Sequence, residues 1–254
     1  MTTTSHADRL TRVVEDVDGR GTPTQVWAAW SRAFPDLELA GWDDVLVLAP
    51  HPDDEVLGVG GLMARLVARG ARVEVLAVTD GEASSPGSPT LTPAALAARR
   101  VGESAAACRV LGVDPPRRAG LPDGRVAAHE GELTDLVAAR LHPGRVCLAT
   151  WVGDGHPDHE AVGRAAAAAC QRTGARLVQY PVWMWHWSAP DDPAVPWESC
   201  AVLGLDPQEL DLKRRSVEHF VTQIHPLSPA PADTAVLPPF VIDRLVTGRE
   251  MVLL

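Results

Sequence analysis

Short apolar runs alternate with longer segments of helical spacing over most of the chain, and this rhythm limits the possible folds more than any other feature. The apolar runs, one of them entirely aliphatic, are residues 45–49, 73–79, 146–151 and 177–182. The segments with helical spacing are residues 55–69, 93–111, 130–141 and 159–173. Strands that alternate with helices in this way form parallel β-α-β units, with helices on both faces of one sheet. We therefore predict an α/β, Rossmann-like fold with a mostly parallel sheet.

The length of 254 residues fits one large α/β domain, and no internal repeat divides the chain. We expect a single domain, residues 1–254, in which residues 1–40 form a helical N-terminal extension. Within it, residues 5–34 have helical spacing that is interrupted at residues 19–24. The apolar residues of the two expected faces are Leu10, Val13 and Val14, and Trp27 and Trp30.

Charge and cysteine usage exclude several classes of function. The net charge of −10 argues against binding to a nucleic-acid backbone, which requires clustered Lys and Arg. The 4 cysteines contain no C-x-x-C pair, so buried free thiols and a reducing compartment are expected. The N-terminal residues carry no apolar signal core, and no run is long enough to cross a bilayer. We expect a cytoplasmic protein without a nucleic-acid partner and without membrane insertion.

The first apolar run leads directly into HPDDE, residues 51–55, where four of the five side chains are ionisable. Like charges packed together at the end of a buried strand cost stability unless an ion of opposite charge binds them. His51 and Asp54 are three residues apart, so a turn lets both point at one cation while Asp53 points elsewhere. Nitrogen and oxygen donors of this kind suit zinc, and also iron or manganese.

A second cluster, GHPDH at residues 155–159, follows the apolar run at 146–151. In a parallel sheet the carboxyl ends of the strands lie at one edge, where ligands bind. His159 is therefore a natural third ligand, and His156 is expected to face the same cavity without binding the metal. Three protein ligands with one open position are typical of a catalytic zinc site rather than a structural one.

Two other interpretations of these residues stay open. HPDD alone is typical of a capped helix start, with aspartates that complement the helix dipole. Gly58, Gly60 and Gly61 follow a strand, and Asp80 closes the next one, which mimics a dinucleotide-binding fingerprint. The spacing GVGG differs from G-x-G-x-x-G, however, so we expect these glycines to let the first helix pack closely on the sheet. A non-catalytic nucleotide-binding Rossmann module is kept as a remote alternative.

Together, APHPDDEVLGVGG and GHPDH resemble the PIG-L/LmbE-like zinc-dependent de-N-acetylases, which act on N-acetylglucosaminyl-phosphatidylinositol and on the precursors of mycothiol and bacillithiol. Four further segments fit the family, namely TDGE at 79–82, R-x-x-E with VLGV at 100–113, LPDG at 121–124 and a late K…H…Q helix at 213–223. The resemblance covers about residues 45–223. It implies an LmbE-like form of the predicted fold.

The resemblance also implies roles for individual residues. His51, Asp54 and His159 would hold Zn2+, with Fe2+ as an alternative. Asp53 would be the general base that deprotonates the attacking water. The residue expected to stabilise the oxyanion or protonate the departing amine is His156, tuned by Asp158. The residues expected to hold the sugar and its aglycone are Arg100 and Asp123.

The implied activity is hydrolytic removal of acetyl from an N-acetylglucosamine-type amine by a zinc-activated water, an N-deacetylase reaction on a linear amide. The implied partner is a small-molecule N-acetylated sugar conjugate. The alternatives are an amidase that acts on another small acylated amine or aminosugar in secondary metabolism, and a catalytically silent relative. A homo-oligomer stays open.

In the segment PVWMWHW, residues 181–187, tryptophans alternate with other residues. In an extended strand, Trp183, Trp185 and Trp187 would therefore share one face. Such a face would line the substrate site, cover a core edge or form an oligomer contact. His186, on the opposite face, is expected to be exposed or structural rather than a ligand.

Overall fold

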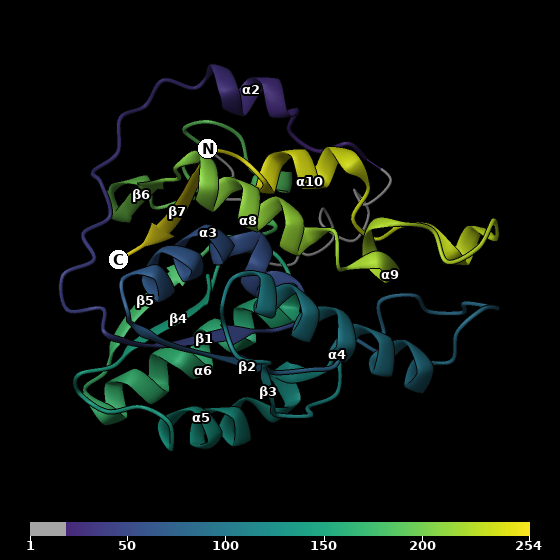
Figure 1. Cartoon of the computed structure of the whole chain (residues 1–254), viewed down its shortest axis with the longest axis horizontal. Coiled ribbons are helices and arrows are strands. Elements are labelled where there is room, and N and C mark those ends of the chain that lie inside the picture. The colour runs from purple at the N-terminus through teal and green to yellow at the C-terminus, as the bar shows by residue number, and fades with distance from the viewer. Residues whose placement is uncertain (1–18) are drawn as a thin grey trace.

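The computed structural model describes residues 19–254, which form a seven-stranded sheet with helices on both faces (Figure 1). The strands are β1 (Asp44–Ala49), β2 (Arg72–Ala77), β3 (Arg117–Arg118), β4 (Val146–Thr150), β5 (Arg176–Tyr180), β6 (Cys200–Gly204) and β7 (Arg249–Leu253). Their order is β3-β2-β1-β4-β5-β7-β6. The first five strands in this order run parallel, whereas β7 is antiparallel to both β5 and β6. The predicted mostly parallel α/β fold is thereby confirmed.

The helices form one layer on each face of the sheet. They are α2 (Thr24–Ala29), α3 (Asp54–Ala68), α4 (Pro93–Val110), α5 (Glu130–Ala138), α6 (Pro157–Thr173), α7 (Met184–Trp187), α8 (Pro207–Val217), α9 (Val221–Ile224) and α10 (Pro239–Leu245). The shorter 3₁₀ turns are Val126–His129, Trp197–Ser199 and Pro231–Asp233. Figure 1 shows α5 and α6 below the sheet and α3 and α8 above it. Among residues 19–254, no helix combines the length and apolar character that a membrane crossing requires.

The N-terminal segment is less helical than expected. The predicted helical stretch at residues 5–18, with Leu10, Val13 and Val14, lies outside the described residues. Beyond it, α2 ends at Ala29, and Trp30 already has extended backbone angles (φ −75°, ψ 119°). The prediction that the helix continues to residue 34 is therefore wrong. The physical reason is pairing with the sheet edge, because the Leu37 N–H donates to the carbonyl of Val202 in β6 at 2.9 Å.

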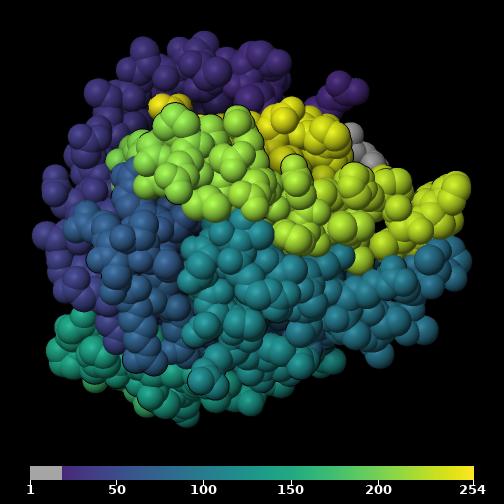
Figure 2. Space-filling model, in the orientation of Figure 1, coloured from purple at the N-terminus to yellow at the C-terminus, as the bar shows by residue number. Residues whose placement is uncertain are grey.

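Alternate residues of β1 supply the two halves of the core. Val45 and Val47 pack with α3, α4 and α8, while Leu46 and Leu48 pack with α5 and α6. All four side chains are fully buried, as expected for a strand covered on both faces. The space-filling view in Figure 2 shows the C-terminal helices, in green and yellow, lying against α4 in teal.

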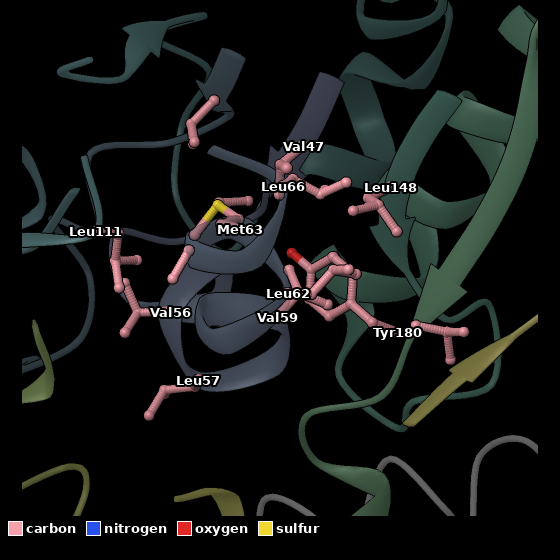
Figure 3. Packing of buried hydrophobic residues seen from close by; sticks show 14 of the residues in the cluster. Val47, Val56, Leu57, Val59, Leu62, Met63, Leu66, Leu111, Leu148 and Tyr180 are labelled. Carbon is pink, nitrogen blue, oxygen red and sulfur yellow. The ribbon is translucent and has the colours of Figure 1, made fainter. Parts of the chain in front are cut away.

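Helix α3 packs very closely on the sheet because Gly58 has no side chain. A Cβ atom at this position would lie 2.2 Å from the ring of Tyr180, which is far inside van der Waals contact. Figure 3 shows Tyr180 beside Leu62 and Val59 of the same helix. The expected role of the glycines in close packing is confirmed at this residue.

The tryptophan segment does not form an extended strand, so its three tryptophans do not share one face. Strand β5 ends at Tyr180, and the chain then turns into the short helix α7. The cause is a tertiary contact, because the Asp154 carboxylate accepts the backbone N–H groups of residues 182, 183 and 184 at 2.9–3.0 Å. The three tryptophans consequently diverge. Trp185 packs on Trp27 and Trp187 stacks on Trp151, while Trp183 lines a cavity.

The other residues of this region have structural surroundings. His186 is buried, and its Nδ1 lies 2.5 Å from the Arg244 guanidinium, which agrees with a structural rather than a ligating role. The expected single helix at 213–223 is also corrected to two helices, α8 and α9. The break between them places Phe220 in the main core, where it is fully buried.

Candidate metal centre

The two ionisable clusters lie next to each other at the carboxyl ends of β1 and β4, where the order of the strands changes direction. HPDDE follows β1 and GHPDH follows β4, and these two strands are hydrogen-bonded neighbours. From β1 the chain adds β2 and β3 on one side, and then returns to add β4 on the other. Such a switch point leaves a crevice at the carboxyl ends of the strands, which is the usual ligand site of open α/β sheets.

Three donor atoms from these clusters form a nearly equilateral triangle. His51 Nδ1 lies 3.2 Å from Asp54 Oδ2, and His159 Nε2 lies 3.2 Å from the same oxygen. The two ring nitrogens are 3.3 Å apart. Donors held by a tetrahedral zinc at about 2.0–2.2 Å lie about 3.3–3.6 Å from one another. His51, Asp54 and His159 could therefore hold a metal ion with little rearrangement.

Carboxylates outside the triangle lie against the outward nitrogens of both histidines. Asp154 Oδ2 lies 2.8 Å from His159 Nδ1, and Asp158 Oδ2 lies 3.3 Å from His51 Nε2. If the outward nitrogens carry the protons, both inward nitrogens have free lone pairs that face Asp54. This arrangement is typical of metal-ligating histidines, which donate their other N–H to a carboxylate or carbonyl. Sequence reasoning missed Asp154, although it lies in the same loop, five residues before His159.

Two other groups of side chains lie close enough to share a cation. His51, His156 and His159 form one, and His51, Asp123 and Asp158 form the other, each with donor atoms within 4.8 Å. Both share His51 with the tighter triangle. We favour the triangle because its donor separations match tetrahedral geometry and because each of its histidines has its own carboxylate partner.

Neighbouring charges outweigh burial in setting the pKa values of the triangle. Burial alone would lower the pKa of His51, but its carboxylate partners raise it well above the ordinary value. At His159 burial is likewise outweighed, mainly by Asp54, and the pKa rises to about 9. The pKa of Asp54 is lowered despite burial, because both histidines lie against it. Protons and a divalent cation thus compete for the same electron-rich donor set.

Asp53 is held in an unusual backbone conformation beside this triangle. Its φ of 151° lies in a region that non-glycine residues rarely adopt. Its carboxylate lies 3.0 Å from the Arg100 guanidinium, and its backbone N–H donates to Glu55 at 3.0 Å. Burial raises the pKa of the Asp53 carboxyl to about 7, against the opposing charge of Arg100. A carboxyl with such a pKa can accept and release a proton near neutral pH.

His156 faces the same cavity and is expected to be uncharged. Its ring centroid lies 4.9 Å from that of His51 and 4.8 Å from that of His159. Burial, together with these two neighbours, lowers the pKa of His156 to about 3. Its Nδ1 accepts the Asp158 backbone N–H at 3.2 Å, so the neutral ring carries its proton on Nε2.

The Asp158 carboxylate does not lie on His156 as the predicted tuning role suggested. It contacts His51 and accepts the backbone N–H groups of Gly124 and Val126 at 2.7 and 3.1 Å. Its effect on His156 is limited to its charge, which partly opposes the lowering of that pKa. The same contacts fix the loop that carries Asp123.

The two predicted substrate-binding residues also reach the cavity. Arg100 is buried, and besides Asp53 it donates to the carbonyls of Gly81 and Pro52 at 2.9 and 3.1 Å. Asp123 lies 3.1 Å from His51 Nε2 and accepts the Ala83 N–H at 2.8 Å. Because its guanidinium is bonded to Asp53 and to nearby backbone carbonyls, the primary role that these contacts indicate for Arg100 is to position Asp53.

These side chains line a cavity of about 390 Å³. The polar residues around it are His51, Asp53, Asp54, Ser84, Arg100, Asp123, His156 and Gln223. The volume falls in the range of small-molecule sites. All eight residues predicted to form the site lie within this cluster, with His159 and Asp158 just behind the cavity wall.

The fold and the site together define a Rossmann-like α/β protein with a candidate metal centre at the switch point of its sheet. The family model described as PIG-L, GlcNAc-PI de-N-acetylase, matches residues 46–170. A solved structure, the conserved protein TT1542 from Thermus thermophilus, is 33% identical, with 71% of this chain and 80% of that chain covered and a TM-score of 0.54. The chain belongs to the PIG-L family.

Other relatives carry functional names. The 1D-myo-inositol 2-acetamido-2-deoxy-alpha-D-glucopyranoside deacetylase of Mycobacterium sp. (strain KMS) is 32% identical over 57% of this chain and 54% of its own length. The structure of the A40926 pseudoaglycone deacetylase Dbv21 is 24% identical, with a TM-score of 0.59 over 84% of this chain and 96% of that one, and shows the likeness of fold. The match to the Mycobacterium deacetylase thus spans about half the length of that relative.

Proposed function

We propose that this protein is a zinc-dependent N-deacetylase that hydrolyses the acetamide of an N-acetylglucosamine-type sugar. The observation that carries the proposal is the triangle of His51, Asp54 and His159 with the unligated carboxylate of Asp53 beside it. The family membership and the deacetylase names of its relatives support the same reaction. Fe2+ suits the same nitrogen and oxygen donors and is the alternative metal.

The donor set fits the ion that the proposal requires. Two imidazole nitrogens and one carboxylate oxygen are a common catalytic zinc set, which leaves a position open. A zinc ion held by His51, Asp54 and His159 would supply Lewis-acid chemistry, which polarises an amide carbonyl and makes water more acidic. Asp154 and Asp158 hold the two imidazoles in the required tautomer and orientation.

Asp53 is the proposed general base. Hydrolysis forms a bond from a water oxygen to the acetyl carbon and breaks the bond from that carbon to nitrogen. The proton lost by the water passes to the Asp53 carboxylate, which Arg100 holds in place at 3.0 Å. The departing nitrogen takes up a proton as the C–N bond breaks, and protonated Asp53 supplies it without an external acid.

His156 is the proposed stabiliser of the developing oxyanion. Because the neutral ring carries its proton on Nε2, it can donate a hydrogen bond to the carbonyl oxygen. A fixed donor of this kind in a water-poor site is worth roughly a hundredfold to a thousandfold in kcat. Its depressed pKa favours this donor role over that of a general acid.

The test is release of free amine from N-acetylglucosaminides by protein that is first stripped of metal with a chelator and then reloaded. We expect activity to disappear on stripping and to return with zinc. Asp53→Asn should abolish it in the reloaded protein, while the exposed surface variant Asp135→Asn should retain it. Zinc binding without amine release from any N-acetylated sugar would overturn the proposed reaction.

A further inference from the structure

The cavity is lined by two kinds of side chain. The polar ones include Asp53, Asp54 and His156 of the site described above. Five residues of the lining are apolar, and we call them the apolar wall, namely Leu57, Val182, Trp183, Val236 and Leu237.

Hydrogen bonds to the backbone hold this apolar wall in place. The Asp154 carboxylate accepts the N–H groups of Val182 and Trp183 at 2.9 and 3.0 Å. In the C-terminal part of the wall, the Leu237 N–H donates to the carbonyl of Gln223 at 2.9 Å. Since the wall is ordered by the protein itself, a ligand does not have to order it on binding.

Two loops that are distant in sequence, one after Ser84 and one before Val236 of the lining, are joined by hydrogen bonds. Ser88 and Thr90 both donate hydroxyl hydrogen bonds to the carboxylate of Asp233, as does Ser228. Figure 2 shows the two loops side by side at the right edge of the molecule, in blue-teal and yellow-green. The Asp233 carboxylate thus ties the loop at 80–92 to the segment that carries the Val236 side of the wall.

Several polar groups next to the apolar wall are hydrogen-bonded to one another. Gln223 is buried, and its Nε2 donates to Ser84 Oγ at 3.3 Å and to Thr222 Oγ1 at 3.0 Å. Thr222 in turn donates its hydroxyl to Glu103 at 2.7 Å.

We propose that the apolar wall contacts the aglycone of the substrate and selects an aryl or alkyl group over a polyol. The proposal rests on the proposed function, because the acetamide must lie at the metal triangle. A polyol pressed against this wall would exchange hydrogen bonds with water for apolar contacts, which costs free energy. An aryl or alkyl group gains from burial and, if aromatic, from packing on Trp183.

The experiment compares kcat/KM of the zinc-loaded protein for four sugars. They are N-acetylglucosamine, its phenyl and octyl glycosides, and its inositol glycoside. We expect the phenyl and octyl glycosides to exceed the inositol glycoside by about tenfold or more, which is the usual range for apolar pocket discrimination. A ratio near one, or a preference for inositol, would overturn the proposal.

Two variants and a control assign the preference to the wall. Trp183→Ala and Val236→Thr should each lower the ratio of phenyl to inositol turnover several-fold, because they remove apolar contact or add a hydroxyl. The control Val221→Thr changes an exposed valine that does not line the cavity and should leave the ratio unchanged. An unchanged ratio in both wall variants would also contradict the proposal.

Direct binding measurements distinguish a wrong assignment of the apolar wall from a wrong assignment of the reaction. If none of the sugars releases amine, the proposed function is lost, and calorimetric titration of the same phenyl and inositol glycosides still measures the wall. Tighter binding of the phenyl glycoside that weakens in Trp183→Ala would then support the apolar subsite. Equal binding of the two glycosides would overturn it.

Discussion

At the scale of single residues, the metal triangle depends on carboxylates that do not belong to it. Asp154 is fully buried and serves two purposes at once. It holds His159 Nδ1 at 2.8 Å and accepts three backbone N–H groups of the turn that carries Trp183. The same side chain therefore links the orientation of a proposed metal ligand to the shape of the cavity wall.

We predict that Asp154→Asn lowers zinc affinity by about 10- to 100-fold, the usual effect of losing a carboxylate partner of a ligating histidine. Asn keeps the size of the side chain but removes the charge that favours the bound tautomer. Competition with a zinc-sensitive chelating dye measures the affinity, and Asp135→Asn on the exposed face of α5 serves as control. Equal affinity in the two variants would show that Asp154 is needed for the turn alone.

Alanine substitution at two helical glycines should change the free energy of unfolding in opposite directions. At Gly58 the new Cβ would clash with Tyr180, whose ring is fixed by a 2.7 Å hydrogen bond to the Leu48 carbonyl. We expect Gly58→Ala to reduce the free energy of unfolding by about 1–3 kcal/mol. At Gly102, which is exposed in α4 with no atom within 4 Å of a new Cβ, alanine should add about 0.5–1 kcal/mol. Urea unfolding of both variants tests the pair, and a loss of stability in Gly102→Ala would contradict the argument.

At the scale of elements, helix α3, which carries Asp54, is interrupted at Val59. A buried ion pair lies at this interruption. Val59 has non-helical angles, and the carbonyl of Leu57 accepts a hydrogen bond from Lys213 Nζ of α8 at 2.9 Å. Glu250 of β7 accepts the N–H groups of Gly61 and Leu62 and lies 2.7 Å from the same Lys213. The pair therefore joins three elements through backbone groups that the interruption of α3 leaves available. Lys213 belongs to the K…H…Q segment that resembles the family, and these contacts give it a structural role.

We predict that Lys213→Met reduces the free energy of unfolding by about 3–5 kcal/mol, because it leaves the Glu250 carboxylate buried without its cation. The double variant Lys213→Met/Glu250→Gln should be more stable than the single one, since it removes that charge but retains an acceptor for the helix N–H groups. Denaturant unfolding of both variants gives the comparison. A double variant less stable than Lys213→Met would contradict a cost that arises from unpaired charge.

At the scale of the whole molecule, the sequence predicts those parts of the fold that depend on local sequence patterns. The aliphatic strand β1 and the helices after it follow from spacing, and the clusters after β1 and β4 follow from the parallel order of the strands. Strands β6 and β7 were not predicted, because their antiparallel pairing joins segments far apart in the sequence. The helical turn within 181–187 was not predicted for the same reason, since a side chain from another loop turns the chain there. Asp154 was missed because its partners become neighbours only in the folded protein.

Metal binding should stabilise the whole domain, since the triangle joins segments about a hundred residues apart. A ligand that binds only the folded state at 100 times its Kd adds about 2.7 kcal/mol. We predict that zinc raises the Tm of the stripped protein by several degrees and that the rise persists in Asp53→Asn. It should be absent in His159→Ala. A full rise in His159→Ala would place the stabilising ion elsewhere.

The most direct test of the central claim is the anomalous difference map of a crystal grown with zinc. We predict one strong peak per chain, bounded by His51 Nδ1, Asp54 Oδ2 and His159 Nε2, with Asp53 unligated beside it. A peak bounded instead by His51 Nε2, Asp123 and Asp158 would contradict the assignment of the triangle as the metal centre.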